Sequence, residues 1–158
     1  MPVRVRPPLG VMALIAGCMQ RSGRQSAVGA WVARTFGRWA ADSMGERGMR
    51  LLEEALEAAQ SAGVSRSVAA RLLERVYSRP AGDLREEAGA VGVTLLALAH
   101  AAGFDADAAE AAEVSRVMAM PGEQIAQRHA AKVAQGIAVP DGHGDAIDPA
   151  VRGTTMPA

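Results

Sequence analysis

Residues 51–59 have the sequence LLEEALEAA, in which apolar side chains recur at spacings of three and four positions. This spacing places the apolar side chains along one side of an α-helix and sets carboxylates beside them. The same periodicity extends from about residue 26 to residue 134, and no strand-like alternation persists anywhere in the sequence. The sequence therefore predicts an all-α fold, built as a helical bundle. The apolar side of this helix comprises Leu51, Leu52, Ala55, Leu56 and Ala59.

Local signals predict where six helices begin and end. Serine and aspartate favour helix N-termini because their side-chain oxygens accept hydrogen bonds from the first backbone amides. Glycine favours a left-handed C-terminus, and proline ends a helix or occupies its first turn. The residues that carry these signals are Gly63, Ser65, Pro80, Asp83, Gly103, Asp105 and Pro121. The predicted helices span residues 26–41, 46–62, 65–79, 83–102, 105–118 and 121–135, with a break near Gly45.

The chain of 158 residues is long enough for one domain with a core but short for two. Apolar residues make up 49% of it and aromatic residues only 3%, and alanine, which packs thin cores, is the most frequent apolar type. Trp31, Phe36 and Trp39 are assigned to that core. We expect an N-terminal extension at 1–25, the helical domain at 26–135 and a disordered C-terminal tail at 136–158. The thin core suggests that a partner subunit completes the bundle.

Charge and cysteine content exclude several classes of function. Lys and Arg together number 17, as do Asp and Glu, so no global field attracts a nucleic acid polymer. The single cysteine, Cys18, cannot form an internal disulfide, which favours a reducing cytoplasm.

The N-terminus has a second interpretation. Arg4 and Arg6 precede the apolar stretch 9–19, whose residues 14–18 read LIAGC and resemble a bacterial lipoprotein signal. The stretch is far shorter than the roughly 20 residues that span a bilayer, so a transmembrane helix and a membrane partner are not expected. The favoured interpretation is a loosely packed extension, which a start at Met12 or Met19 would shorten or remove.

Glu53, Glu54 and Glu57 form an acidic cluster on the second predicted helix. Spacings of three and four residues bring these carboxylates into one neighbourhood of the helix surface, where like charges repel unless a cation offsets them. Magnesium, which prefers oxygen ligands and keeps several waters, is one such cation. From the cluster alone, a solvated acidic helix face is the stronger interpretation.

A second carboxylate pair, Glu86 and Glu87, precedes the apolar run 93–98 on the fourth predicted helix. Carboxylates that project inward from neighbouring helices are a known way of building metal sites in helical bundles. Gly89 and Gly92 would allow close approach of a facing helix. The two acidic helices could therefore face each other across the bundle.

The two motifs resemble the signature of the MazG-like all-α nucleoside triphosphate pyrophosphohydrolases, which is Glu-Glu-x-x-Glu on one helix and Glu-x-x-Asp on a later one. Glu53, Glu54 and Glu57 match the first part, and Glu87 matches the start of the second. Ala90 stands where the family has its aspartate. The wider resemblance is to a phage and bacterial branch, in which a small residue is usual at that position. It covers about residues 31–132, chiefly 31–37, 46–50, 77–80, 87–95 and 103–105.

The resemblance implies hydrolysis of a nucleoside triphosphate between its α and β phosphates, which yields the monophosphate and pyrophosphate. Glu54, Glu57 and Glu87 are the implied ligands of Mg²⁺, with Mn²⁺ as a substitute, and Glu53 would position or deprotonate the attacking water. The candidate phosphate-binding residues are Arg47, Arg50, Arg128 and Lys132, for which ordinary surface charge is an equally good interpretation. Asp83 or Glu113 could supply the oxygen that Ala90 lacks.

The branch also implies a substrate and a setting. A purine nucleotide, with (d)GTP as first choice, would be hydrolysed in the cytoplasm of a bacterial or phage-infected cell. In phage, the branch implies that the dGMP product serves as the precursor of 2-aminoadenine nucleotides. Relatives assemble as dimers or tetramers, so a homodimer or homotetramer is expected. The alternative is a non-catalytic helical nucleotide-binding or interaction module that has lost part of the metal site, and Ala90 is its main support.

Overall fold

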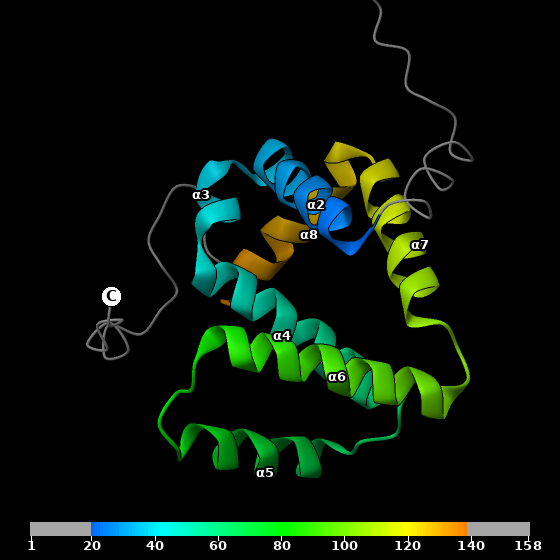
Figure 1. Ribbon diagram of the computed structural model, residues 1–158. Helices are drawn as coiled ribbons and strands as arrows, with labels where there is room; N and C mark the ends of the chain where they lie inside the picture. Colours follow the sequence, from blue (N-terminus) through cyan, green and yellow to red (C-terminus); the bar gives the residue numbers. More distant parts are fainter. Residues whose placement is uncertain (1–19, 139–158) are drawn as a thin grey trace, which may run out of the picture. The chain divides into compact units, whose positions relative to one another are not determined.

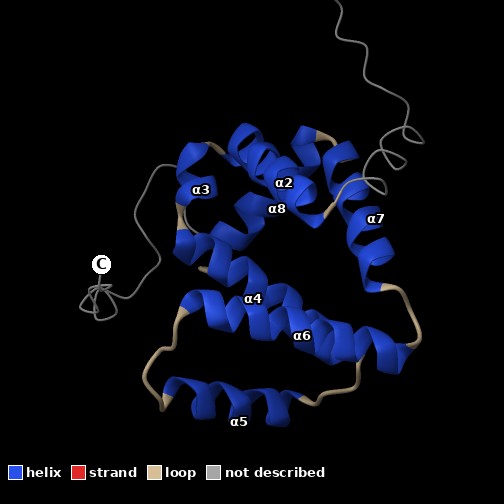
Figure 2. Ribbon diagram, in the orientation of Figure 1, coloured by secondary structure: helices blue, strands red, loops and turns tan. Residues whose placement is uncertain are grey.

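The computed structural model describes residues 20–138, and within that range the chain forms helices and loops without any strand (Figures 1 and 2). The all-α prediction is confirmed. The predictions for residues 1–19 and 139–158, including the lipoprotein-like signal and most of the tail, lie outside the described residues. The helices are α2 (Arg21–Phe36), α3 (Arg38–Asp42), α4 (Met44–Ser61), α5 (Arg66–Tyr77), α6 (Leu84–Ala102), α7 (Ala106–Ala119) and α8 (Gly122–Ala134).

The prediction for the first helix is wrong in two respects. The observed helix begins at Arg21 rather than at residue 26, so residues 21–25 of the expected extension are helical. It also breaks at Gly37, whose φ of 91° lies outside the helical region and suits glycine. A Cβ at this position would lie 3.1 Å from Cδ1 of Trp39, so the tryptophan packs closely over the break. The break predicted near Gly45 lies instead at Ser43, and Gly45 is inside α4.

The predicted helix ends after residue 60 are largely confirmed. Ser65 and Asp83 cap α5 and α6, because their side-chain oxygens accept from backbone amides of the first turn. Asp105 accepts from the amide of Ala108 at the start of α7. Gly63 and Gly103 have φ of 87° and 76°, as expected of left-handed C-terminal glycines.

The chain divides into two compact units. One comprises Ala59–Ala119 and contains α5, α6 and α7. The other comprises Arg21–Ala58 and the described residues from Met120 onward, and contains α2, α3, most of α4 and α8. We call them the α5–α7 unit and the α2–α4/α8 unit.

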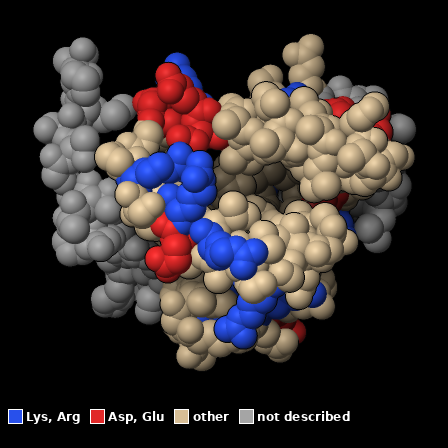
Figure 3. Space-filling model, turned by 90° about the horizontal axis from the view of Figure 1, so that it is seen from below, with Lys and Arg blue, Asp and Glu red and all other residues tan. Residues whose placement is uncertain are grey.

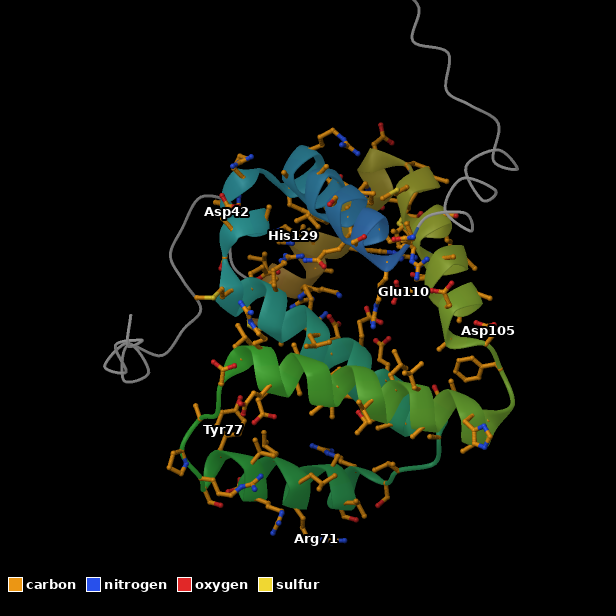
Figure 4. All side chains as sticks on the ribbon, viewed as in Figure 1. Asp42, Arg71, Tyr77, Asp105, Glu110 and His129 are labelled. Atoms are coloured by element: carbon orange, nitrogen blue, oxygen red, sulfur yellow. The ribbon has the colours of Figure 1, made fainter. Side chains whose placement is uncertain are left out.

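The α2–α4/α8 unit has a small core in which α2 and α3 pack together. Val32, Ala40 and Ile125 are buried there. The rings of Trp31 and Phe36 meet edge to face with centroids 5.7 Å apart, and Phe36 also packs on His129 of α8 with ring centroids 5.5 Å apart. His129 is labelled in Figure 4. Trp31, Phe36 and Trp39 are only half-buried, so the predicted aromatic core is shallow.

Large apolar side chains remain exposed on α4, α5 and α6, including the three leucines of the predicted apolar side of α4. α5 has no buried residue at all. Wide areas of the face in Figure 3 carry neither basic nor acidic side chains. The exposed residues on these three helices include Leu51, Leu52, Leu56, Val68, Leu72, Leu73, Val76, Val91, Leu95 and Leu96.

No single helix within residues 20–138 is long and apolar enough to cross a membrane. α6 and α7 reach the required length and composition only when taken together, and the chain bends by 104° between them.

Two glycines of α6 provide a test of its C-terminal cap. An alanine at Gly103 meets no atom within 4 Å, so its cost is the left-handed backbone alone, and we expect Gly103→Ala to lower the free energy of unfolding by about 1 kcal/mol. Gly89 lies inside the same helix with equally open space, and Gly89→Ala should raise that free energy by about 0.5–1 kcal/mol. Urea denaturation followed by circular dichroism measures both. If both substitutions changed the free energy of unfolding in the same direction, the left-handed conformation of Gly103 and the helical conformation of Gly89 could not both be right.

Candidate functional site

A row of charged side chains runs along the first half of α4 and begins at a buried carboxylate. Glu46 is only 1% exposed, the most deeply buried large side chain among residues 20–138. The hydroxyl of Ser43, just before the helix, accepts from the amide of Glu46 at 3.2 Å and so fixes the first turn. Glu46 Oε1 lies 3.4 Å from both Arg47 Nη2 and Arg50 Nε. A buried carboxylate is stable only with such partners, so Glu46 holds two guanidinium groups on one side of α4.

Arg50 occupies the centre of this row. Its Nη1 donates to Glu53 Oε2 at 2.6 Å, one turn further along α4. Its Nη2 donates to the carbonyl oxygen of Ile137, just after α8. On the third side, Glu46 Oε1 is an ion-pair partner 3.4 Å from Nε, although Nε makes no hydrogen bond within residues 20–138. Arg50 therefore joins α4 to the chain that follows α8.

Lys132 of α8 makes the second connection to α4. Its Nζ lies 2.7 Å from Glu53 Oε2, although the two residues are 79 positions apart in the sequence. Their side chains are 31% and 24% exposed, so the ion pair lies at the edge of the unit, within reach of solvent. One carboxylate oxygen of Glu53 thus accepts from both Arg50 and Lys132.

These contacts change the acidity of Glu53. The hydrogen bond from Lys132 is the main cause that lowers the pKa of its carboxyl, and the charges of Arg50 and Lys132 act in the same direction. Burial opposes them but is outweighed. Glu53 is therefore an ionised hydrogen-bond acceptor, and while Lys132 is in place it is a weaker base than an ordinary glutamate.

Glu54 and Glu57 lie on the same helix with exposed side chains. Their donor chemistry fits a hard divalent cation, because Mg²⁺ in proteins is commonly held by one or two carboxylates and several waters. Spaced one turn apart, the two carboxylates reach a common point on the helix surface. Among residues 20–138, no three His, Cys, Asp or Glu side chains come together as a ready-made metal cluster.

Glu87, the third predicted ligand, lies on the first turns of α6 in the α5–α7 unit, whereas Glu54 and Glu57 belong to the other unit. Its carboxylate folds back over Gly82, where a Cβ would lie only 2.6 Å from Glu87 Oε1. The predicted metal site is therefore described in two separate parts, with Glu54 and Glu57 in one unit and Glu87 in the other.

The two residues considered as substitutes for the missing aspartate have other partners. Asp83 caps α6, and its Oδ1 accepts from the amides of Arg85 and Glu86. Glu113 is bound by Arg116 in a two-point ion pair, and this hydrogen bonding lowers the pKa of Glu113. The donors therefore already occupy Oδ1 of Asp83 and both carboxylate oxygens of Glu113.

Three of the four predicted phosphate-binding residues come together. Arg47, Arg50 and Lys132 are connected through Glu46 and Glu53. Arg128 is exposed, and its side chain makes no ion pair or hydrogen bond within the part of the chain that the structure describes.

Sequence reasoning missed the role of Glu46 and the pairing of Glu53 with Lys132. The pattern Ser43-x-x-Glu46, followed by Arg50 four residues later, was a usable signal for the first, because it marks a helix start and an i,i+4 ion pair. No local pattern connects Glu53 with Lys132.

Comparison of the chain with protein-family models, curated proteins and solved structures gives no match.

The pairing of Glu53 predicts a pH-dependent contribution to stability. Because its pKa is lowered in the folded state, the contribution is present above the unfolded pKa of about 4.3 and is lost as the pH falls through the lower, folded pKa. At pH 7 we expect Glu53→Gln to lower the free energy of unfolding by up to about 1 kcal/mol, as for a partly exposed ion pair. The urea midpoint of Glu53→Gln should begin to approach that of the wild type as the pH falls below about 4.3 and should meet it below the folded pKa of Glu53.

Glu54→Gln is the matched control, because Glu54 has no ion pair or hydrogen bond within residues 20–138. Its urea midpoint should stay close to that of the wild type across the same pH range. An equal effect of both substitutions would mean that the ion pairs of Glu53 contribute nothing of their own.

Proposed function

We propose that this chain is a metal-dependent (deoxy)nucleoside triphosphate diphosphatase that releases pyrophosphate. The observation that carries the proposal is the 2.7 Å contact between Glu53 and Lys132, which sets a cation beside the acidic face of α4. Hydrolysis of a triphosphate needs carboxylates for a metal ion and basic groups for the phosphates within one site. The α2–α4/α8 unit combines both on α4 and α8.

Each side chain of α4 has a distinct part in the proposed reaction. Glu54 and Glu57 offer exposed oxygen ligands, and Glu87 is the proposed third ligand. Bound Mg²⁺ or Mn²⁺ would neutralise phosphate oxygens and lower the pKa of a coordinated water. Glu53 orients the attacking water and accepts its proton. Glu46 remains behind them as the buried partner of Arg47 and Arg50.

The basic residues differ in how readily they can bind phosphate. Arg50 has two hydrogen-bond acceptors and one further ion-pair partner, and it serves chiefly to hold α4 against the end of α8. Lys132 and Arg128 are more accessible, lie four residues apart on α8 and therefore share a face of that helix. We assign the phosphate contacts mainly to these two side chains, with Arg47 beside them.

The substrate class rests on the motif resemblance. It favours a purine nucleotide, (d)GTP first, and a role in the cytoplasm of a bacterial or phage-infected cell, where the dGMP product could serve 2-aminoadenine nucleotide synthesis.

A second candidate function is a helical nucleotide-binding module without turnover. The observation that favours it is Ala90, whose methyl group on α6 stands where the related signature has an aspartate. Such a protein would bind a triphosphate through the same cations and release no pyrophosphate.

Assembly with further copies of the chain is part of the proposal. Val68, Leu72 and Val76 recur every four residues and line one side of α5, yet all are exposed in the single chain. An isolated helix of 12 residues is marginal in water, so α5 needs a partner for this side. A second copy, which brings the same apolar side, supplies a self-complementary contact and gives a homodimer or, by pairing of dimers, a homotetramer.

Turnover tests the catalytic proposal. We expect pyrophosphate release from dGTP with Mg²⁺ or Mn²⁺, its loss with a chelator, and a decrease in kcat of about 10²–10⁴-fold in Glu53→Gln, the range for removal of a general base. Glu74→Gln, on the exposed surface of α5, is the matched control and should retain wild-type kcat. Nucleotide binding without pyrophosphate release under either metal would favour the non-catalytic module, and preference for dCTP or dUTP would exclude the purine assignment.

Light scattering coupled to size exclusion tests the assembly. We expect a mass of two or four times 16.4 kDa for the wild type and a smaller mass, or loss of helical signal, for Leu72→Glu. Arg71 lies next to Leu72 and points to the side of α5 away from α6 (Figure 4), so Arg71→Glu is the matched control and should keep the wild-type mass. A folded wild-type monomer would contradict the proposed assembly.

A further inference from the structure

Lys132 has a single acceptor within residues 20–138, and that acceptor is the proposed catalytic carboxylate. Its ammonium group is 2.7 Å from Glu53 Oε2, on a side chain that is 31% exposed. A lysine of this kind is a compact charge on a flexible stem and can move between neighbouring anions. Arg50, the other donor to Glu53, is held on three sides and lacks this freedom.

A triphosphate chain would compete directly with Glu53 for Lys132. The phosphate oxygens carry more charge than one carboxylate, and the lysine cannot serve both with full contact. In the structure, Glu53 Oε2 already accepts from both Arg50 and Lys132. Whatever draws Lys132 away therefore removes one of the two donors to this oxygen.

We propose that the triphosphate of the substrate takes Lys132 from Glu53, so that substrate binding itself frees Glu53 Oε2 to accept a hydrogen bond from the attacking water. This inference rests on the proposed function, because it assigns the role of the base to Glu53. It makes the Glu53–Lys132 ion pair a latch between α4 and α8 that is closed without substrate. Without substrate, Oε2 accepts from both Lys132 and Arg50, and a bound phosphate chain removes the first of these donors.

The latch has a consequence that a merely structural ion pair lacks. Coupling between two competing ligands of one group is reciprocal, so the Glu53 carboxylate must weaken phosphate binding to Lys132. Removing the negative charge at Glu53 should therefore tighten triphosphate binding while it abolishes turnover. If Lys132 only tied the two helices together, the same substitution would leave affinity unchanged or weaken it through loosening of α8.

Calorimetric titration with inorganic tripolyphosphate, in the presence of a chelator, tests the inference without metal or base contacts. We expect Glu53→Gln to bind the probe about tenfold more tightly than the wild type, a change of about 1.4 kcal/mol. Glu54→Gln removes the same charge one residue away without releasing Lys132, and it should change the affinity much less. Circular dichroism and thermal melting confirm that each variant is folded.

A double-mutant cycle with Lys132→Met assigns the effect to the latch. The tightening by Glu53→Gln should disappear when Lys132 is replaced, because no lysine is then released. Equal tightening in both backgrounds, or by Glu54→Gln, would overturn the inference in favour of general electrostatics, and absence of tightening would overturn it outright. Failure of the proposed function is a separate result. If the tightening depends on Lys132 but no pyrophosphate is released from dGTP, the latch is supported and the catalytic proposal is overturned.

Discussion

Burial of the Glu46 carboxylate is the constraint on which the α2–α4/α8 unit depends. A charge removed from water must be paired, and here its partners are Arg47 and Arg50 on the same helix. Arg50 connects the buried carboxylate to the rest of the unit, because it also donates to Glu53 and to the carbonyl oxygen of Ile137. Lys132 completes the row through Glu53. Charges alternate along the whole row, so each side chain is oriented by its neighbours and α8 is fixed to α4 by polar contacts.

The helix ends could be predicted because their causes are local. Capping by Ser65 and Asp83 and the left-handed conformation of Gly103 involve atoms within about one turn of the chain. The break at Gly37 was missed because a glycine inside an apolar periodic segment is compatible with a continuous helix. What decides the matter is the packing of Trp39 over the glycine, and a pattern of residue types does not contain that contact.

The candidate site was predictable to a similar extent. The grouping of Glu53, Glu54 and Glu57 follows from spacing on one helix, and so does the ion pair of Arg50 with Glu53 three residues later. The contact of Lys132 with Glu53 joins positions 79 residues apart and depends on how α8 packs, so no spacing rule reaches it. Glu46 was overlooked because a glutamate among arginines normally indicates a solvated helix face. Only the surrounding helices make it a buried charge.

The exposed apolar side chains have a further consequence for folding. Val68, Leu72, Leu73 and Val76 of α5 are each roughly half-exposed, so burying the remainder contributes on the order of 1 kcal/mol per side chain. Counted over two copies, this amounts to about 8 kcal/mol, similar to the whole stability of a small domain, which is about 5–15 kcal/mol. A chain with few aromatic residues and many alanines buries few other large apolar side chains in its interior. In the proposed assembly, association would therefore be part of the folding of α5 rather than a later docking of finished subunits, and stability should then depend on protein concentration.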